Sequence, residues 1–260
     1  MGSHSLWSRF IFLISLNKTK NMKKILLISG LILLATGCSK TSPKPADLTS
    51  STSSTSSSSQ TASSLPSQSD IDSAEVNNIT LAPGTYPNVT NFQGVGLQIQ
   101  SPWKDSTVVA KQTSTAIAIQ NQEGAKFFII KSPLDSSPLT WAMSRFQANT
   151  AQLKQIFGVR ADSNYDFQDL IYNVTPARIA SLPTNGQSVM SALLAQKELE
   201  VTQLPLYSFS TPTIHGFIMG NSAAKSRLVE FYTIDSDVEY TIGLENMTSS
   251  ESDFVLSNIK

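Results

Sequence analysis

The sequence predicts an α+β fold, in which an antiparallel sheet is covered by helices. Short apolar runs with a period of two residues occur in residues 95–131 and again in residues 199–244, and this pattern is typical of strands. Between them, apolar residues recur at steps of three and four, as in amphipathic helices. Strands and helices that are segregated along a chain in this way are typical of α+β domains.

Charge and composition exclude several classes of function. The first 44 residues contain seven basic and no acidic residues, whereas residues 38–260 contain 14 basic and 19 acidic residues, a balance of −5. A mildly acidic body argues against binding of nucleic acid, which requires clustered Lys and Arg. The single Cys38 rules out a disulfide within the chain and a cysteine-built zinc site. With His4 and His215 as the two histidines, we expect no metal centre and no cofactor.

Residues 22–38 show the three regions of a signal peptide. Lys23 and Lys24 precede an apolar run over residues 25–34, which is too short to span a bilayer, and small residues follow it. The run Leu34-Ala35-Thr36-Gly37-Cys38 resembles the lipobox of bacterial lipoproteins, although Ala35 stands where that family most often has Leu. The resemblance implies that the Cys38 thiol receives a diacylglyceryl group and that signal peptidase II cuts before it. The alternative is an ordinary signal peptide in which Cys38 is a small buried hydrophobe.

Residues 1–21 do not fit this scheme, because a second apolar patch over residues 10–16 lies ahead of the lysine pair. We therefore expect Met22 to be the true start and residues 1–37 to be removed when the chain is processed at Cys38. A longer basic region at the start of the signal peptide is the alternative.

Residues 38–91 are predicted to form a disordered tether. Between residues 48 and 69, 16 of 22 residues are Ser or Thr, with no charged or aromatic residue, so this stretch has nothing to bury. A flexible chain of about 50 residues spans roughly 40 Å. The Pro83-Gly84 and Pro87-Asn88 pairs read as turns that lead into a single domain over residues 92–260.

The first part of that domain is predicted to be strands. Val95, Leu97 and Ile99 alternate with polar or small residues, and Trp103 follows Pro102. Three further apolar runs occupy residues 108–110, 116–119 and 127–130, and residues 121–124 make a plausible hairpin loop between the last two.

A helical region follows. Ser137 is a good N-cap, Pro138 suits the first helical turn and Gly158 is a stop signal, so one helix is predicted over residues 139–157. Its apolar stripe is expected to be core, and a ligand-binding Met or aromatic box is the alternative. Residues 162–197 are predicted to be helical in pieces, with an interruption at Thr175-Pro176.

Strands return in the last third of the domain. They are predicted over residues 199–209, 213–219, 227–234 and 238–244, with a turn at residues 235–237. Ser249 or Ser250 can cap a closing helix that ends near Ile259.

A family resemblance covers the domain. Four features carry it: the opening Gly96-Leu97-Gln98-Ile99-Gln100-Ser101-Pro102-Trp103, the helix after the first hairpins, the strand pair at residues 229–234 and 239–242, and the ending Leu256-Ser257-Asn258-Ile259. Together these features resemble the Mog1/PsbP-like α/β/α sandwich. That resemblance implies binding or assembly rather than catalysis.

Motifs for catalysis are weak. A Ser-His-Asp triad needs a histidine, and His215 lies in a strand pattern that favours a surface or edge-strand position, with a general base as the alternative. Gly94-Val95-Gly96 lacks the third glycine of a dinucleotide-binding loop. We therefore predict no catalytic, cofactor or metal residues.

Acidic and aromatic residues offer the remaining candidates. Two acidic sets, which lack the spacing of a calcium loop, are expected to be solvated turn and helix-start carboxylates. Five tyrosines are candidates for carbohydrate binding, but closing the edge of a core is their commoner role. The acidic sets are Asp162, Asp166 and Asp169, and Asp235, Asp237 and Glu239; the tyrosines are Tyr165, Tyr172, Tyr207, Tyr232 and Tyr240.

These observations predict a lipoprotein anchored by Cys38 at the extracytoplasmic face of the cell membrane. Its domain is expected to bind or scaffold an envelope protein, peptide or polymer, without nucleic acid. Two alternatives are a cell-envelope hydrolase that uses a pair of carboxylates and a carrier of a small ligand or lipid.

Overall fold

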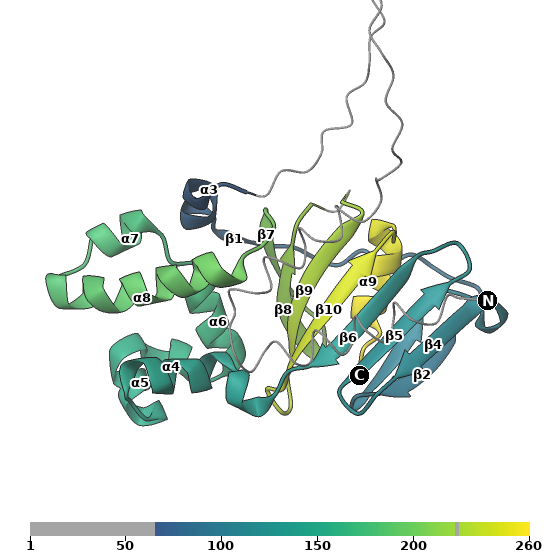
Figure 1. Ribbon diagram of the computed structural model, residues 1–260, viewed down its shortest axis with the longest axis horizontal. Coiled ribbons are helices and arrows are strands. Elements are labelled where there is room, and N and C mark those ends of the chain that lie inside the picture. The colour runs from purple at the N-terminus through teal and green to yellow at the C-terminus, as the bar shows by residue number, and fades with distance from the viewer. Residues whose placement is uncertain (1–65, 222–223) are drawn as a thin grey trace, which may run out of the picture. The chain divides into compact units, whose positions relative to one another are not determined.

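The computed structural model describes residues 66–221 and 224–260, and it confirms the α+β class. An eight-stranded sheet has the order β1-β7-β8-β9-β10-β6-β5-β4, and a separate hairpin pairs β2 with β3 (Figure 1). Except for the parallel pair β1 and β7, the recorded strand pairs are antiparallel. The strands are β1 (Val76–Asn78), β2 (Thr90–Gly94), β3 (Leu97–Ser101), β4 (Val108–Gln112), β5 (Ala116–Asn121), β6 (Lys126–Lys131), β7 (Leu206–Ser210), β8 (Ile214–Met219), β9 (Ser226–Thr233) and β10 (Glu239–Glu245).

Helices accompany both faces of the sheet. In Figure 1, α4 to α8 gather beside strands β7 to β9, whereas β2 lies at the β4–β5 end. The helices are α3 (Gln68–Ser73), α4 (Pro138–Phe146), α5 (Thr150–Phe157), α6 (Asn164–Tyr172), α7 (Pro176–Ala180), α8 (Thr184–Glu200) and α9 (Ser249–Ser257).

Two hydrophobic cores lie on the opposite faces of the sheet, because successive strand side chains point to opposite sides. On β8, Ile214 and Ile218 enter a core shared with β3 and α9, whereas Phe217 and Met219 enter a core shared with α3 to α6 and α8. The sheet is therefore covered by α9 and the β2–β3 hairpin on one face and by α3 to α6 and α8 on the second.

The β2–β3 hairpin turns at Val95 and Gly96, whose φ angles are 52° and 87°. Two consecutive residues with positive φ are the signature of a type I′ hairpin turn, which is unfavourable for a β-branched residue. The Tyr240 hydroxyl donates a hydrogen bond of 3.1 Å to the Val95 carbonyl and holds this turn against β10. Ile99 bridges to Ile259, so the hairpin is also joined to the end of the chain.

The helix predicted over residues 139–157 is two helices. Ser137 caps α4 and Pro138 occupies its first turn, as predicted, but α4 ends where Gln147 takes a left-handed conformation with φ of 50°. Asn149 and Gln152 then form a capping box that begins α5. The prediction of one helix was wrong because the apolar period continues across this break and hides the Asn149 cap.

The strand predicted over residues 199–209 is shorter than expected. Helix α8 continues to Glu200 and β7 begins at Leu206. Residues 192–200 are mostly strong helix formers, which explains the extension of α8. The interruption at Thr175 and Pro176 is confirmed, since Thr175 caps α7 and Pro176 is its first residue.

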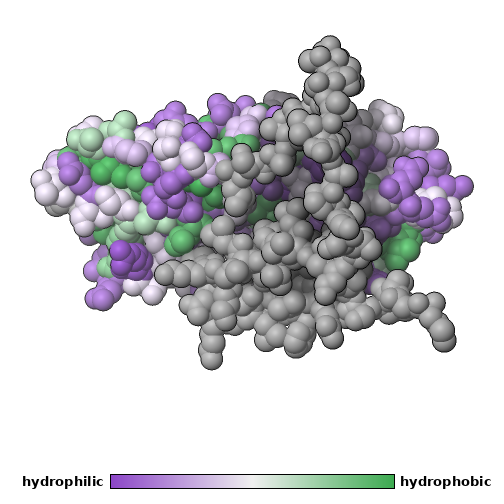
Figure 2. Space-filling view, turned by 45° about the horizontal axis from the view of Figure 1, so that its top comes forward, coloured by the Kyte–Doolittle hydropathy of each residue, from purple (hydrophilic) through white to green (hydrophobic). Residues whose placement is uncertain are grey.

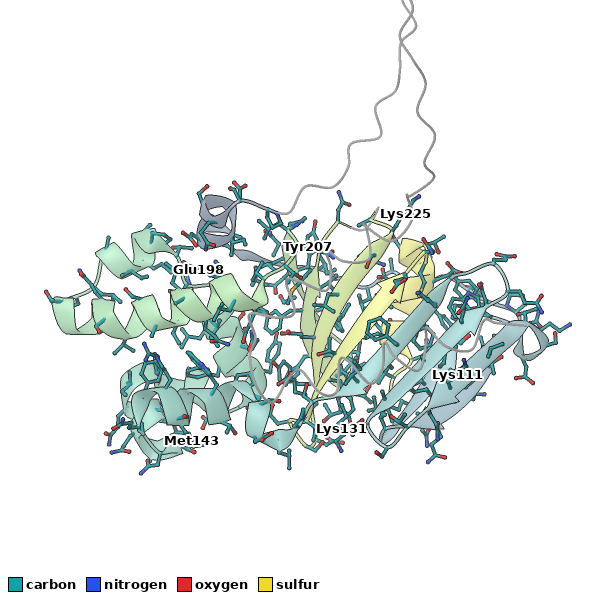
Figure 3. The ribbon with its side chains drawn as sticks, in the orientation of Figure 1. Lys111, Lys131, Met143, Glu198, Tyr207 and Lys225 are labelled. Carbon is teal, nitrogen blue, oxygen red and sulfur yellow. The ribbon has the colours of Figure 1, made fainter. Side chains whose placement is uncertain are left out.

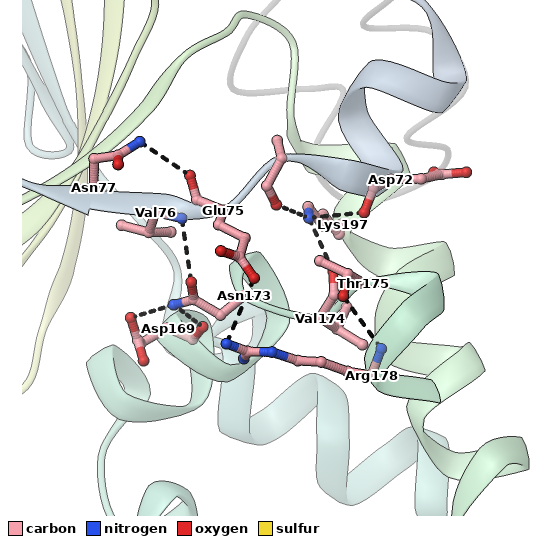
Figure 4. Close-up of polar contacts among 11 residues, drawn as sticks. Asp72, Glu75, Val76, Asn77, Asp169, Asn173, Val174, Thr175, Arg178 and Lys197 are labelled. Atoms are coloured by element: carbon pink, nitrogen blue, oxygen red, sulfur yellow. Dashed lines mark hydrogen bonds and ion pairs between the residues drawn. The ribbon is translucent and has the colours of Figure 1, made fainter. Parts of the chain in front are cut away.

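The structure also differs from the expectation of a tether up to residue 91. Helix α3 and strand β1 lie within that stretch, and β1 pairs with β7. Lys197 on α8 is fully buried, and its ammonium group donates to the carbonyls of Ala74 at 2.5 Å, Val174 at 2.9 Å and Asp72 at 3.4 Å (Figure 4). Residues 72–76 are thus held by long-range contacts, which the composition of this stretch does not predict.

On the surface formed by the helices, apolar and polar side chains are mixed (Figure 2). In the described part of the chain, no helix has the length and apolar character needed to cross a membrane.

Candidate functional site

A pocket of about 320 Å³ lies where four segments distant in sequence meet. This volume falls at the lower end of the ~300–1,000 Å³ of small-ligand sites. Pro102 and Trp103 are buried and form the floor, whereas most of the rim is exposed. The lining residues are Pro87 and Asn88 before β2, Pro102, Trp103 and Lys104 after β3, Thr107 before β4, Asn121, Gln122 and Glu123 at the β5–β6 turn, and Glu251 in the first turn of α9.

Trp103 is held in place on three sides. Its carbonyl accepts a hydrogen bond of 2.8 Å from the Thr90 hydroxyl, and its backbone N–H donates to the Ser101 hydroxyl at 3.1 Å. Its indole Nε1–H donates to Glu251 Oε1 at 2.8 Å, and its ring lies 5.7 Å from that of Phe127. The floor of the pocket is therefore preformed.

Another part of the pocket lining is shaped by an Asx turn at Asn121. Asn121 Oδ1 accepts hydrogen bonds from the backbone N–H groups of Glu123 at 3.0 Å and Ala125 at 2.9 Å. Gly124 has a φ of 89°, a conformation that glycine adopts at little cost. With Oδ1 occupied in this way, the Asn121 amide has its NH₂ group left to donate.

Both carboxylate oxygens of Glu251 make hydrogen bonds that hold the fold together. Its Oε1 accepts from Trp103, and its Oε2 accepts from the Thr248 backbone N–H at 2.8 Å and the Thr248 hydroxyl at 2.9 Å. This is the capping box of α9, extended to the indole. With three donors, both carboxylate oxygens of Glu251 are engaged in hydrogen bonds within the fold.

The remaining polar groups of the pocket are available for a ligand. Among the described residues, the side chains of Asn88, Lys104, Gln122 and Glu123 make no hydrogen bond or ion pair. Lys104 and Glu123 carry opposite charges, so these groups add no net charge. The pocket can therefore offer amide donors and acceptors beside an apolar floor.

His215 is not at an edge of the sheet, because β8 lies between β7 and β9. Its ring stacks on that of Tyr165, with centroids 3.7 Å apart and planes at 13°. Burial lowers the pKa of His215, while the nearby Asp237 and Asp166 carboxylates oppose that shift. In the described part of the chain the imidazole has no hydrogen bond to a hydroxyl, so the general-base alternative gains no support.

The structure brings one residue of each acidic set, Asp166 and Asp237, to the start of α6. Asp237 accepts hydrogen bonds from the backbone N–H groups of Asn164 at 2.7 Å and Tyr165 at 3.4 Å. Burial raises the pKa of Asp237, and these N–H groups oppose the rise. Asp166 accepts from the Ser163 hydroxyl at 2.7 Å as part of the α6 cap. These carboxylates thus stabilise a helix start.

The other four acids of these sets have local roles or lie at the surface. Asp162 pairs with Lys154, Asp169 accepts from Asn173 at 2.8 Å, Glu239 accepts from Ser132 at 2.6 Å and Asp235 is exposed. Within residues 66–221 and 224–260, no cluster of three His, Cys, Asp or Glu is placed to hold a metal ion.

The five candidate tyrosines mainly close the core. Tyr172 and Tyr232 are fully buried, and the Tyr172 hydroxyl donates to Glu230 at 2.6 Å. Tyr240 is buried, Tyr165 on α6 stacks on His215 of β8, and Tyr207, which is labelled in Figure 3, is half-buried on β7. The pocket residues were missed in the sequence because Trp103 reads as core and Asn121 as a turn residue.

The predicted lipidation site, Cys38, lies outside the described residues. The chain matches no family model, and no curated protein matches it.

Proposed function

We propose that this chain is a lipoprotein, anchored through Cys38 at the extracytoplasmic face of the cell membrane, whose domain binds an envelope partner. The anchor is supported by the lysine pair, the apolar run and the lipobox-like sequence that ends at Cys38. The Ser/Thr-rich residues 48–64 between the anchor and the described domain support a spacer role.

The proposed binding role rests on the hydrogen bonds that Glu251 already makes within the fold. The alternative of a hydrolase requires two carboxylates across a cleft, and Glu123 and Glu251 do line one pocket. Both oxygens of Glu251 already accept hydrogen bonds from Trp103 and Thr248, so we assign Glu251 a structural role rather than a place in such a pair. A preformed pocket with unused amide groups favours recognition instead, and the Mog1/PsbP-like resemblance points in the same direction.

The anchor is tested by membrane fractionation of the Cys38→Ser variant beside Ser39→Ala. Cys38→Ser is expected in the soluble fraction, because the thiol that receives the lipid is gone. Ser39→Ala is expected to stay with the membrane. Membrane association of Cys38→Ser would contradict the anchor.

The binding role is tested by crosslinking on intact cells. A photo-crosslinking residue at position 122, on the pocket rim, is expected to capture an envelope component. The same residue at position 155, which is exposed on α5, is the matched control. Equal capture at both positions, or none at position 122, would count against the pocket as the binding site.

A further inference from the structure

We infer that the Trp103 pocket recognises an uncharged saccharide unit. This inference rests on the proposed binding function and names the ligand class for the same site. It follows from the kinds of side chain that converge on the pocket rather than from any one of them.

The polar groups suit sugar hydroxyls, each of which both donates and accepts a hydrogen bond. Asn88 and Gln122 each present a donor and an acceptor side by side, and the Asn121 amide can donate because its oxygen is occupied within the turn. A carboxamide can therefore engage two neighbouring hydroxyl groups at once. The Thr107 hydroxyl donates to the Lys104 carbonyl at 2.7 Å, so its oxygen is left to accept.

The charges argue for a neutral ligand. Lys104 and Glu123 lie on the same rim with opposite sign, and the Glu251 carboxylate is satisfied by Trp103 and Thr248. An anionic ligand would meet Glu123 and a cationic ligand would meet Lys104, whereas hydroxyl groups can use both.

The apolar part of the pocket suits the C–H face of a pyranose ring. Pro102 and Trp103 form the floor and Pro87 lies at the rim. Because hydrogen bonds hold Trp103 through its carbonyl, its backbone N–H and its indole, binding would need little rearrangement.

The test is an NMR titration of the full chain, labelled with ¹⁵N-tryptophan, with neutral tetrasaccharides of glucose and of N-acetylglucosamine as probes. The chain has three tryptophans, Trp7, Trp103 and Trp141. The Trp103 indole signal is expected to shift and to saturate with at least one probe, whereas that of Trp141 on α4 stays unchanged. Gln122→Ala combined with Lys104→Ala is expected to weaken binding about thirtyfold, since each of the two lost hydrogen bonds contributes ~1 kcal/mol. Gln155→Ala is the matched control.

Two results would overturn the inference. One is a Trp103 signal that responds to neither tetrasaccharide at millimolar concentration. The other is a signal that responds to an oligouronate or a charged peptide but to neither neutral sugar. If position 122 still captures an envelope component in cells, the binding role stands and the saccharide class alone is wrong.

Discussion

The indole of Trp103 and the carboxylate of Glu251 are joined by a hydrogen bond of 2.8 Å across 148 positions of the sequence. This bond links the end of β3 to the first turn of α9, and the same carboxylate caps that helix. The Glu251 side chain thus lines the pocket, holds the Trp103 indole and completes the capping box of the last helix.

The energy of this bond is accessible to a double-mutant cycle. Trp103→Phe, Glu251→Ala and the double variant are compared in urea unfolding. The coupling free energy is expected to be about 1–2 kcal/mol, because one partner is charged and the bond is partly buried. The cycle subtracts the loss of the helix cap, which Glu251→Ala also causes. A coupling near zero would show that the two residues act independently.

Lys197→Met is expected to release α3 and β1. The variant leaves the carbonyls of Ala74 and Val174 without their donor, and each unsatisfied buried group costs ~1–3 kcal/mol. Hydrogen exchange over residues 68–78 should accelerate, and the midpoint of urea unfolding should fall. Lys225→Met, at an exposed position, is the control. Unchanged exchange in Lys197→Met would mean that α3 and β1 are held by their other contacts, such as the pairing of β1 with β7 and the hydrogen bond from the Val76 N–H to Asn173.

The stability of the chain should depend on pH through Lys197. Burial lowers its pKa from 10.5 to about 8, so the unfolded chain binds more protons between these values. The cost of the buried charge is fully present below pH 8 and is relieved as the pH rises toward 10.5. From pH 7.5 to 9.5, the free energy of unfolding of the native chain should therefore rise relative to that of Lys197→Met. A constant difference would contradict the lowered pKa.

The stability of the chain should also depend on pH through His215, in the acidic range. Because burial lowers its pKa, the unfolded chain takes up the proton first as the pH falls through 6.5, and stability is lost below that pH. An NMR titration of the His215 ring should give a midpoint below 6.5. His215→Gln should remove part of the loss on acidification. A midpoint at or above 6.5 would show that Asp237 and Asp166 outweigh burial.

Two sheet glycines should differ in their tolerance of alanine. A Cβ at position 216 would come within 2.3 Å of the Glu230 carbonyl, which belongs to the backbone of β9. A Cβ at position 243 would meet the ring of Phe128, which can rotate away. Gly216→Ala is therefore expected to lower the free energy of unfolding by ~1–3 kcal/mol, and by more than Gly243→Ala does. The opposite order in urea unfolding would contradict this reasoning.

Local signals were sufficient for much of the fold. The Ser137 cap, the break at Thr175 and Pro176, and the turn at residues 235–237 depend on neighbouring residues, and the structure confirms each of them. The division of residues 139–157 into α4 and α5 was missed, although the Asn149 cap is itself local. The apolar residues keep a helical period across the break, and this period predicts one helix even though Asn149 can cap a second.

The sequence by itself determined the α+β class, since the change from a period of two to a period near 3.6 reports which face of each element is buried. Tertiary structure alone decided where the domain begins and where its pocket lies. Lys197 donates to the carbonyls of Asp72 and Ala74, more than 120 positions away, and the pocket joins residues 87–123 to Glu251. Such contacts depend on how distant segments meet in space, and a periodic pattern in one segment carries no record of them.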